Sequence, residues 1–526
     1  MSTKEKKIKV AIIGGGIGGL SLAAGLVKQA HVDVHVYESV PEYKDIGAGL
    51  ALHMNAIKAM DQIGPHVKKA YFEKALTMAE EADEEMSTQV SIASGPNTGA
   101  VVAELGKAKG RKTVARSDLL AGLKALIPSH RLHFNKRLES IHERPDDTID
   151  ITFKDGRKKH VDCLIAYDGV HSTVRTYLLG ADHPATHPKN HDGWQIYRTM
   201  LPTAEAKKHI DEKYTRSVPI LCGPKGHINI MPLHRGKDIS AGVAVRGARS
   251  PNQTTTPPLR PEDFTSYSPS AQAIVRLIAL DTSFSWAISD HDPAPFYSRR
   301  RICLAGDAAH TSLPFAGQGA AQALEDAAVL TALFKDLAPP SASTPPSPSR
   351  RSSASSSSSS PSFSSDDDPL SSRSPGRLIP HLFAAYDHVR RPRSQKVVDI
   401  ARDFGRLYGF ALPGYRDDPE KMRGFFGRMA RFTNDADIEG QNSMAVERFW
   451  GLVRMEEGGW GVVRGREGGG EEGMRGREGE EGLGEGMVKE ERERVDEKVE
   501  GMGEKGLSWE EAEVLRAGVG AQAVAA

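Results

Sequence analysis

Three glycines near the start of the chain have the spacing of a phosphate-binding turn. The pattern Gly14-x-Gly16-x-x-Gly19 follows the β-branched run 8–13 and opens an Ala/Leu-rich stretch with helical periodicity. In such a turn the first glycine permits a tight bend, the second lets the backbone approach a pyrophosphate, and the third lets helix and strand pack closely. The free N–H groups and the dipole at the helix N-terminus then favour an anion.

An acidic residue at the end of the next strand adds a site for a sugar. The β-rich run 32–37 ends at Glu38, where a carboxylate can accept hydrogen bonds from a ribose 2′-OH. Strand, turn, helix and strand within about 30 residues form a βαβ unit. The pattern predicts dinucleotide binding. The alternatives are a glycine turn that serves packing alone and a solvated carboxylate at a strand end.

A second constellation lies around residue 307. The apolar strand RICLAG ends at Gly306-Asp307, and a glycine-rich turn opens an Ala-rich helix at Gly319-Ala320. A carboxylate at a strand end can bind a ribitol or ribose hydroxyl. Backbone N–H groups at the start of the helix can face the electron-rich end of a flavin ring. An ordinary N-cap would explain Asp307 alone but not the whole string.

The elements that must position these groups alternate between α and β. Strand and helix patterns alternate to about residue 174, and short runs separated by Gly, Pro and charges follow at 193–245. The latter predict an antiparallel sheet. The segment from Pro339 is dominated by Ser and Pro, and the chain beyond Glu456 consists largely of Gly, Glu and Arg. Neither can bury enough apolar surface to order, so both should be disordered.

Composition excludes several other classes of protein. The 526 residues include 69 Lys+Arg and 69 Asp+Glu, so the zero net charge favours neither nucleic acid nor an anionic membrane as partner. Three scattered cysteines do not make a disulfide framework, and no His/Cys/Asp cluster has metal-ligand spacing. No window has the about 18–20 apolar residues of a membrane span. We expect a cytoplasmic protein without a metal.

Taken together, three strings resemble a known family. The glycine turn at 14–19, AYDGVHSTVR at 166–175, and GDAAH…P…GQG…EDA at 306–327 are similar in order and spacing to the fingerprints of class A FAD-dependent aromatic hydroxylases. Within that family of flavoprotein monooxygenases the chain looks most like salicylate hydroxylase and similar fungal FAD-dependent monooxygenases. The resemblance covers about residues 8–335 and 380–450. It implies FAD as cofactor, with NADH or NADPH as electron donor.

The resemblance also assigns roles to individual residues. It implies adenosine contacts at the Gly14 turn and Glu38, and a pyrophosphate or ribityl contact at Arg116. It further implies ribitol binding by Asp307 and flavin-edge contacts at Gly319 and Ala320. The full set of cofactor-binding residues expected is Gly14, Gly16, Gly19, Glu38, Gly49, Ala51, Arg116, Asp168, Asp307, Gly319 and Ala320. Without the resemblance, Arg116 and Arg175 would be interpreted as surface arginines.

Several positions depart from the family pattern or have open roles. Tyr167 stands where a small residue is usual, and Met231 replaces an aromatic residue, often Tyr, before a proline. Arg198 is the candidate catalytic residue, because its guanidinium fork matches a substrate carboxylate or phenolate. Its alternative is a structural ion pair in the sheet. His227 and His310 are open between proton transfer and local structure.

The resemblance implies an α/β fold: a Rossmann-like FAD-binding domain with an inserted antiparallel β-sheet substrate domain and C-terminal helices. The expected limits are 1–180 and 291–337 for the FAD-binding domain, 181–290 for the sheet domain, 338–378 for the disordered insertion, 379–455 for the helical segment and 456–526 for the disordered tail.

The implied activity is hydroxylation of a small aromatic substrate, a salicylate-like phenolic acid, by O2 and NAD(P)H through a C4a-hydroperoxyflavin. One alternative is the same chemistry on a polyketide, alkaloid or terpenoid intermediate of secondary metabolism. Another is a flavin-binding protein without turnover, whose insertion and tail bind partners. The complete set of fingerprints argues against the last.

Overall fold

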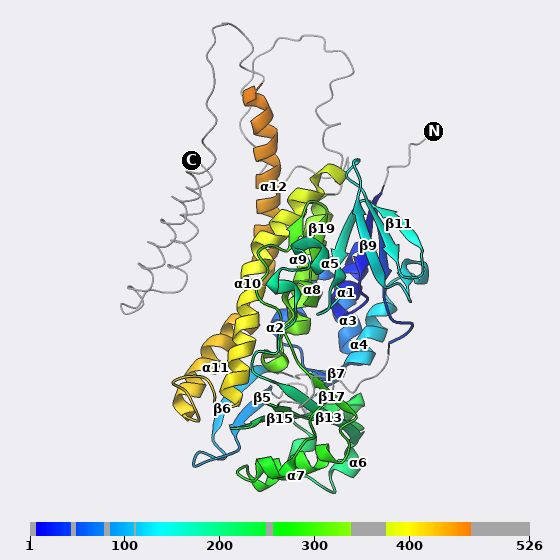
Figure 1. Cartoon of the computed structure of the whole chain (residues 1–526). Coiled ribbons are helices and arrows are strands. Elements are labelled where there is room, and N and C mark those ends of the chain that lie inside the picture. The colour runs from blue at the N-terminus through cyan, green and yellow to red at the C-terminus, as the bar shows by residue number, and fades with distance from the viewer. Residues whose placement is uncertain are drawn as a thin grey trace, which may run out of the picture. The chain divides into compact units, whose positions relative to one another are not determined.

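The structure is a computed structural model that describes residues 7–43, 49–77, 85–109, 112–248, 256–337 and 375–463 (Figure 1). Most of the predicted insertion and tail, together with Gly47 and Ala48, lies outside these ranges. The chain divides into two compact units, Met1–Gly458 and Gly459–Ala526. The sheets, the cavity and the contacts described below all belong to the first unit.

A largely parallel sheet forms the centre of the nucleotide-binding part. Its strand order is β18-β19-β12-β1-β2-β8, and β1 pairs in parallel with both β2 and β12. Helix α1 connects β1 to β2 and is buried along almost its whole length, which matches its lack of charged residues. The bounds are β1 (Ile8–Ile13), α1 (Ile17–Leu26), β2 (Val32–Tyr37), β8 (Leu132–His133), β12 (Cys163–Ala166), β18 (Ser298–Arg299) and β19 (Ile302–Leu304). The predicted Rossmann-like α/β class is confirmed.

Smaller elements surround this sheet. Two three-stranded sheets have the orders β11-β10-β9 and β3-β7-β4. Their strands are β3 (Gly49–Leu50), β4 (Leu76–Thr77), β7 (Lys112–Ala115), β9 (Leu138–Glu143), β10 (Ile149–Phe153) and β11 (Lys158–Val161). The accompanying helices are α2 (Met54–Ile63), α3 (Pro65–Lys74), α4 (Arg116–Lys124), α5 (Thr173–Leu179), α8 (Asp307–His310) and α9 (Gly319–Asp336).

The second large sheet has seven strands in the order β17-β13-β16-β15-β14-β5-β6. All neighbours pair antiparallel except β14 with β5. The strands are β5 (Glu85–Ile92), β6 (Val101–Lys109), β13 (Gln195–Pro202), β14 (Ile220–Gly223), β15 (Gly226–Leu233), β16 (Asp238–Val245) and β17 (Phe284–Ala287). The expected sheet segment 181–290 therefore leaves out β5 and β6. These two strands precede β12 in the sequence but belong to the seven-stranded sheet. The spacing of turn residues predicts a hairpin between neighbouring strands. It does not predict which distant strand pairs with the hairpin.

Side chains of the seven-stranded sheet alternate between two environments. Tyr197, Ile228 and Val243 belong to an apolar cluster with α7 (Pro269–Ala279), on the face away from the parallel sheet. Their strand neighbours on the opposite face, among them Ile196 and His227, line a cavity. Because successive side chains in a strand point to opposite faces, one face is sealed by α7 and the other is available to a ligand.

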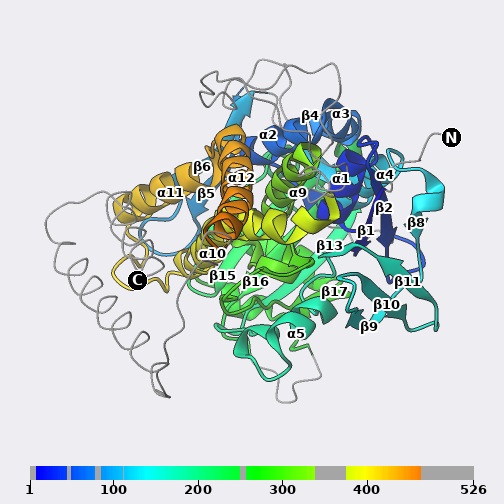
Figure 2. The same ribbon diagram turned by 90° about the horizontal axis from the view of Figure 1, so that it is seen from above.

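Helices from the end of the chain join the two sheets. Helix α10 contacts α9 on one side and β14 and β15 on the other, and α11 packs on β6; Figures 1 and 2 show α10 running beside both sheets. These C-terminal helices are α10 (Ile379–Tyr408), α11 (Pro419–Asn434) and α12 (Ile438–Val463). A short helix earlier in the chain, α6 (Thr203–Ala206), contacts β13 and β16 of the second sheet. Short 3-10 turns are η1 (Ser129–Arg131), η2 (Pro184–Thr186), η3 (Glu212–Thr215), η4 (His234–Gly236), η5 (Pro261–Phe264), η6 (Pro314–Ala316) and η9 (Pro375–Leu378).

A buried charge cluster fixes α10 to α9. Arg390 donates to Glu325 Oε2 at 2.6 Å and to Asp326 Oδ1 at 2.7 Å, and the side chains of all three are inaccessible to water. Arg393 adds a bond to Glu325 at 2.7 Å. Burial alone would raise the pKa of Asp326, but His310 and Arg390 beside it hold that pKa well below its usual range. Buried charges are tolerated only when paired in this way.

No helix among the described residues is long and apolar enough to span a membrane.

Replacing Arg390 should destabilise the fold far more than replacing its neighbour. Arg390→Met leaves two buried carboxylates short of a cation, and we expect a loss of about 3 kcal/mol in the free energy of unfolding. Arg391→Met removes only a partly exposed pair with Asp387 and should cost roughly 1 kcal/mol or less. Urea unfolding of the flavin-loaded variants, followed by circular dichroism, measures both values. Equal losses would contradict a special role for the buried cluster.

Candidate active site

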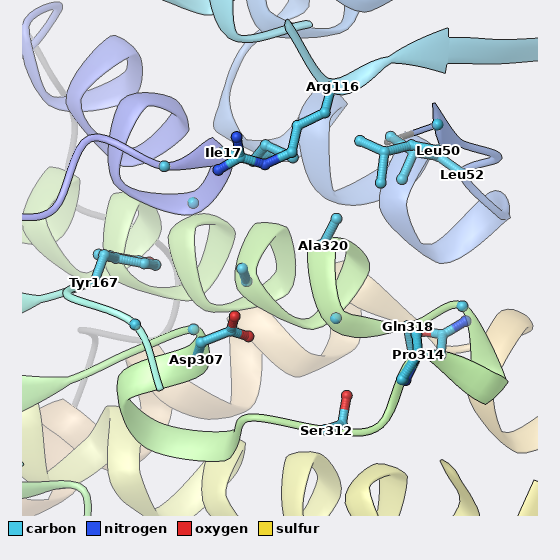
Figure 3. Close-up of a pocket in the computed structure, with 18 of the residues that line it drawn as sticks. Ile17, Leu50, Leu52, Arg116, Tyr167, Asp307, Ser312, Pro314, Gln318 and Ala320 are labelled. Carbon is cyan, nitrogen blue, oxygen red and sulfur yellow. The ribbon is translucent and has the colours of Figure 1, made fainter. Parts of the chain in front are cut away.

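A cavity of about 620 Å³ lies where the carboxyl ends of β1, β2, β12 and β19 meet the seven-stranded sheet. Ligands of open α/β sheets bind at this edge. Every candidate site residue predicted from the sequence lines the cavity except Gly19. Figure 3 shows Arg116 and Asp307 reaching toward the cavity from opposite sides.

The first turn needs glycine at two of its three marked positions. Gly14 has a φ of +105°, and a Cβ there would lie 2.2 Å from the carbonyl oxygen of Tyr167. A Cβ on Gly19 would lie 2.1 Å from the carbonyl oxygen of Gly14, so Gly19 serves the close packing of α1 on β1. A Cβ on Gly16 would meet no protein atom within 4 Å. The fold itself would therefore tolerate a side chain at Gly16. The absence of one leaves space in the cavity.

Hydrogen bonds from the glycine turn and from the two residues that follow Glu38 fix the position of its carboxylate. Its carboxylate accepts hydrogen bonds from the N–H groups of Gly15 at 2.7 Å and Val40 at 2.9 Å, and from the Ser39 hydroxyl at 3.1 Å. The carboxylate is half-buried beside the cavity, so it is not merely a solvated strand end. Oε1 accepts two of these bonds and Oε2 accepts one, so Oε2 retains a lone pair that can accept a further hydrogen bond.

Asp307 and Arg116 are the charged groups of the middle of the cavity. Arg116 is the first residue of α4, and Asp307 is the first residue of α8, directly after β19. The Asp307 side chain is exposed at the cavity. Partial desolvation in this recess raises its pKa, while His310 and Arg116 lower it. A carboxylate so placed is a hydrogen-bond acceptor for hydroxyl groups of a ligand.

Asp168 and Arg175 also have structural tasks. Asp168 accepts hydrogen bonds from the Ser172 hydroxyl at 2.5 Å and the Thr173 N–H at 2.9 Å, which holds the start of α5. Burial raises the pKa of Asp168 to about 6, although these bonds oppose the shift. Arg175 is 1% exposed and donates to the carbonyls of Ala185 and Ala309. It is therefore neither a surface arginine nor a group that lines the cavity.

The start of α9 forms the wall near the seven-stranded sheet. Gly317 has the left-handed φ of +63° and turns the chain so that Gly319 and Ala320 begin the helix at the cavity. The first N–H groups of a helix have no partner within the helix, and its dipole is positive at this end. His310 is buried and bonds to Asp326 at 2.6 Å, so its role is structural.

The far wall of the cavity carries polar groups on an apolar face. Arg198 and Asn229 project from β13 and β15, among Ile196, Ile220 and Phe315. Arg198 Nε is buried and has no hydrogen-bond partner among the described residues, and no described carboxylate pairs with this side chain. The expected alternative of a structural ion pair is therefore absent there. Burial lowers the pKa of Arg198, and its guanidinium lies 5.7 Å from the Trp286 ring centre.

His227 lies beside the same wall in a strongly apolar setting. Its ring contacts those of Phe315 and Tyr408, with centroids 5.2 and 4.8 Å away. Burial lowers its pKa to about 3, so the imidazole is neutral at ordinary pH. Nδ1 has no hydrogen-bond partner among the described residues. A neutral imidazole here can exchange a hydrogen bond with a ligand but cannot supply a positive charge.

Sequence reasoning missed several residues of this wall. Asn229 follows His227 by two positions on one strand, and period-2 alternation could have placed both on the same face. Thr88 and Leu105 come from β5 and β6 and carry no sequence signal for their position, since only the long-range pairing brings them to the cavity.

Comparison with known proteins identifies the family. Residues 7–339 match the FAD binding domain family. The chain is 33% identical over 463 residues to 6-methylsalicylate 1-monooxygenase of Aspergillus terreus, covering 86% of this chain and 95% of that protein. It is 29% identical over 429 residues to salicylate hydroxylase of Pseudomonas putida, covering 78% and 88%. A solved structure of a salicylate hydroxylase substrate complex matches with a TM-score of 0.66 and 26% identity, covering 84% of this chain and 99% of that one.

The chain belongs to this family of FAD-binding oxidoreductases. It is an FAD-dependent monooxygenase, a class that uses NAD(P)H and O2. The resemblance found in the sequence is thereby confirmed, and the alternative of a flavin-binding protein without turnover is set aside.

The residues at the cavity fit FAD. The space over Gly16 and the start of α1 suits a pyrophosphate, Glu38 offers acceptors for a ribose, and Asp307 offers them for a ribitol chain. The N-terminus of α9 suits the edge of a flavin that takes up negative charge. When bound, FAD supplies electron transfer from NAD(P)H and the activation of O2.

Gly16→Ala should weaken FAD binding strongly without unfolding the protein. The added methyl group meets no protein atom but fills the approach to the helix N-terminus. We expect FAD affinity to fall at least about 100-fold, as for loss of a close backbone contact with pyrophosphate. Gly427→Ala, on an exposed face of α11 where a Cβ also meets nothing, is the matched control and should retain wild-type affinity. Titration of the apoproteins with FAD, followed by flavin fluorescence, measures the difference.

The low pKa of His227 predicts a contribution to acid sensitivity. The unfolded chain protonates this histidine near its ordinary pKa of 6.5, whereas the folded protein does so near pH 3. The free energy of unfolding must therefore fall as the pH drops from 6.5 toward 3. His227→Gln should flatten this fall, and the exposed His209→Gln should serve as the control. An unchanged pH dependence in urea unfolding of His227→Gln would contradict a buried, neutral His227.

Proposed function

We propose that this monooxygenase hydroxylates a small aromatic acid of the salicylate type. The observation that carries the proposal is Arg198, a half-buried arginine whose Nε is buried and unpartnered among the described residues, on the apolar wall of the cavity. A desolvated donor of this kind favours an anion, and its fork matches a carboxylate. The named activities of the Aspergillus terreus and Pseudomonas putida relatives support the same substrate class.

We propose the cofactor contacts in the same terms. Gly14, Gly16 and Glu38 bind the adenosine and pyrophosphate side of FAD, supported by the open turn and the free acceptor capacity of the carboxylate. Arg116 approaches the pyrophosphate or ribityl chain, and Asp307 the ribitol hydroxyls. The remaining contacts proposed are Gly49, Ala51, Asp168, Gly319 and Ala320. Gly19 contributes through packing.

Within the cavity the protein has three tasks. Arg198 orients the aromatic acid through its carboxylate, so that the ring lies against the flavin. Ile196, Ile220 and Phe315 surround the ring and keep water out, which protects the activated oxygen from wasteful release. His227 offers a neutral hydrogen-bonding group. Met231 has no hydroxyl, so it cannot bond to a phenolate as a tyrosine would.

The domain limits and the cellular location are proposals as well. We assign residues 1–180 and 291–337 to FAD binding and 181–290 to the substrate, with β5 and β6 added to the substrate sheet. The helical segment is 379–455. A cytoplasmic location remains a prediction from the cysteine pattern.

A second candidate is the same chemistry on an intermediate of secondary metabolism. Some relatives carry names that state no aromatic acid, among them the FAD-dependent monooxygenase pigN of Monascus ruber, which is 30% identical over 429 residues, covering 78% of this chain and 89% of that protein. A larger substrate would depend less on one carboxylate. The dependence of turnover on Arg198 therefore separates the two candidates.

Purified flavoprotein should oxidise NADH or NADPH in the presence of salicylate, with equal O2 uptake. Mass spectrometry of the product distinguishes a catechol formed with loss of CO2 from a dihydroxybenzoate. Arg198→Met should raise the KM for salicylate about 10–100-fold, the value of a charge-assisted hydrogen bond. Arg276→Met, exposed on α7, is the control. If salicylate and other hydroxybenzoates stimulate only H2O2 formation, the aromatic-acid proposal is wrong and the second candidate stands.

A further inference from the structure

A glycine stands between the two polar groups of the substrate wall. Strand β16 lies between β13 and β15, and its Gly242 is in register with Arg198 on one side and Asn229 on the other. Residues directly opposite one another in antiparallel strands share a face. The three positions thus form one row across the sheet, and both flanking side chains line the cavity.

Both polar side chains lean over this glycine. A Cβ on Gly242 would lie 3.0 Å from Asn229 Oδ1 and 3.7 Å from Arg198 Nε. The two groups therefore approach the same small space, which a side chain at 242 would fill. No hydrogen bond joins them among the described residues, and Arg198 Nε has no other partner there. The row contains two polar groups aimed at a gap rather than at each other.

The glycine is not required by the backbone. Gly242 has no left-handed φ, and it lies in the middle of a regular eight-residue strand paired on both sides. Glycine weakens a strand interior, and where it occurs it often marks a site that a ligand approaches closely. Its neighbours two residues away along β16, Ser240 and Ala244, carry side chains, so the gap is local.

We infer that Gly242 forms a notch that receives the carboxylate of the aromatic substrate, with Arg198 and Asn229 on its two sides. Gly242 is then a specificity-determining residue, because it decides whether an anionic substituent can lie between the two polar groups. Rotation of the Asn229 amide by 180° about its last bond brings the NH2 group toward the anion. The inference rests on the proposed function, since it names the subsite of an aromatic acid.

The test compares a charged probe with its neutral isostere. Benzoate and benzamide have the same shape, and each can be titrated into the FAD-loaded protein while the flavin absorbance is followed. In Gly242→Ala the methyl group occupies the notch, and we expect benzoate affinity to fall about tenfold or more while benzamide affinity changes less than about threefold. Ile239→Val, on the opposite face of the same strand, is the control for altered packing and should change neither affinity.

A second variant keeps the inference testable if Gly242→Ala loses FAD or folds poorly. Asn229→Asp retains the size of the side chain and places a negative charge beside the notch. We expect it to weaken benzoate at least about tenfold and to leave benzamide within about threefold. Loss of both probes to the same extent in both variants would overturn the carboxylate notch.

The experiment also separates this inference from the function on which it rests. If wild-type protein prefers benzoate to benzamide and Arg198→Met removes the preference, but the changes at 242 and 229 do not, then the notch is wrong and the aromatic-acid function stands. If wild-type protein shows no preference for benzoate, both the notch and the proposed substrate class fail.

Discussion

The end of strand β12 holds together the turns that make the cavity. The ring of Tyr167 packs where a side chain on Gly18 or Gly306 would stand, with ring atoms 2.4 and 2.9 Å from an added Cβ, and its carbonyl lies against Gly14. The ends of β1, β12 and β19 are thereby fixed against one another. The large residue at 167 is accommodated because Gly18 and Gly306 leave room for its ring. Three of the turns that line the cavity begin at these strand ends, so this side of the cavity depends on the contact.

A second constraint is electrostatic and extends from the same place. Asp326, which accepts the Gly306 N–H at 2.8 Å, also pairs with Arg390 on α10. Helix α10 in turn packs against strands β14 and β15 of the seven-stranded sheet. The strand end that presents Asp307 is thus connected through one buried carboxylate to the helix that bridges the sheets. Buried ion pairs contribute little net stability but are costly to break, so such a cluster favours one arrangement over others.

Much of the wall proposed for the cofactor could be predicted from the sequence, and much of the wall proposed for the substrate could not. The Gly14 turn, Glu38 and Asp307 occupy the ends of consecutive local elements, so short-range spacing was sufficient to bring them to one edge of a parallel sheet. The substrate wall is different, because Thr88 and Leu105 reach it only through the pairing of β5 with β14, over a separation that no local pattern encodes. Arg175 shows a further limit. Its position in the motif at 166–175 did not reveal that its guanidinium donates its hydrogen bonds to backbone carbonyls.

Buried polar groups that are bonded within the protein have a structural role here, whereas an unpartnered group on the cavity wall is a candidate for ligand binding. Arg175, Arg390 and Glu325 are buried and bonded within the protein, whereas the half-buried Arg198 has a buried Nε with no partner among the described residues, on a wall of apolar side chains. Burial of a donor without a partner costs free energy, and a fold retains it where a ligand restores the bond. An anion at Arg198 would do so, in the part of the cavity that the apolar wall and the start of α9 line. The free-energy cost of leaving Arg198 Nε without a hydrogen-bond partner is therefore the strongest physical reason to expect a charged aromatic substrate in this monooxygenase.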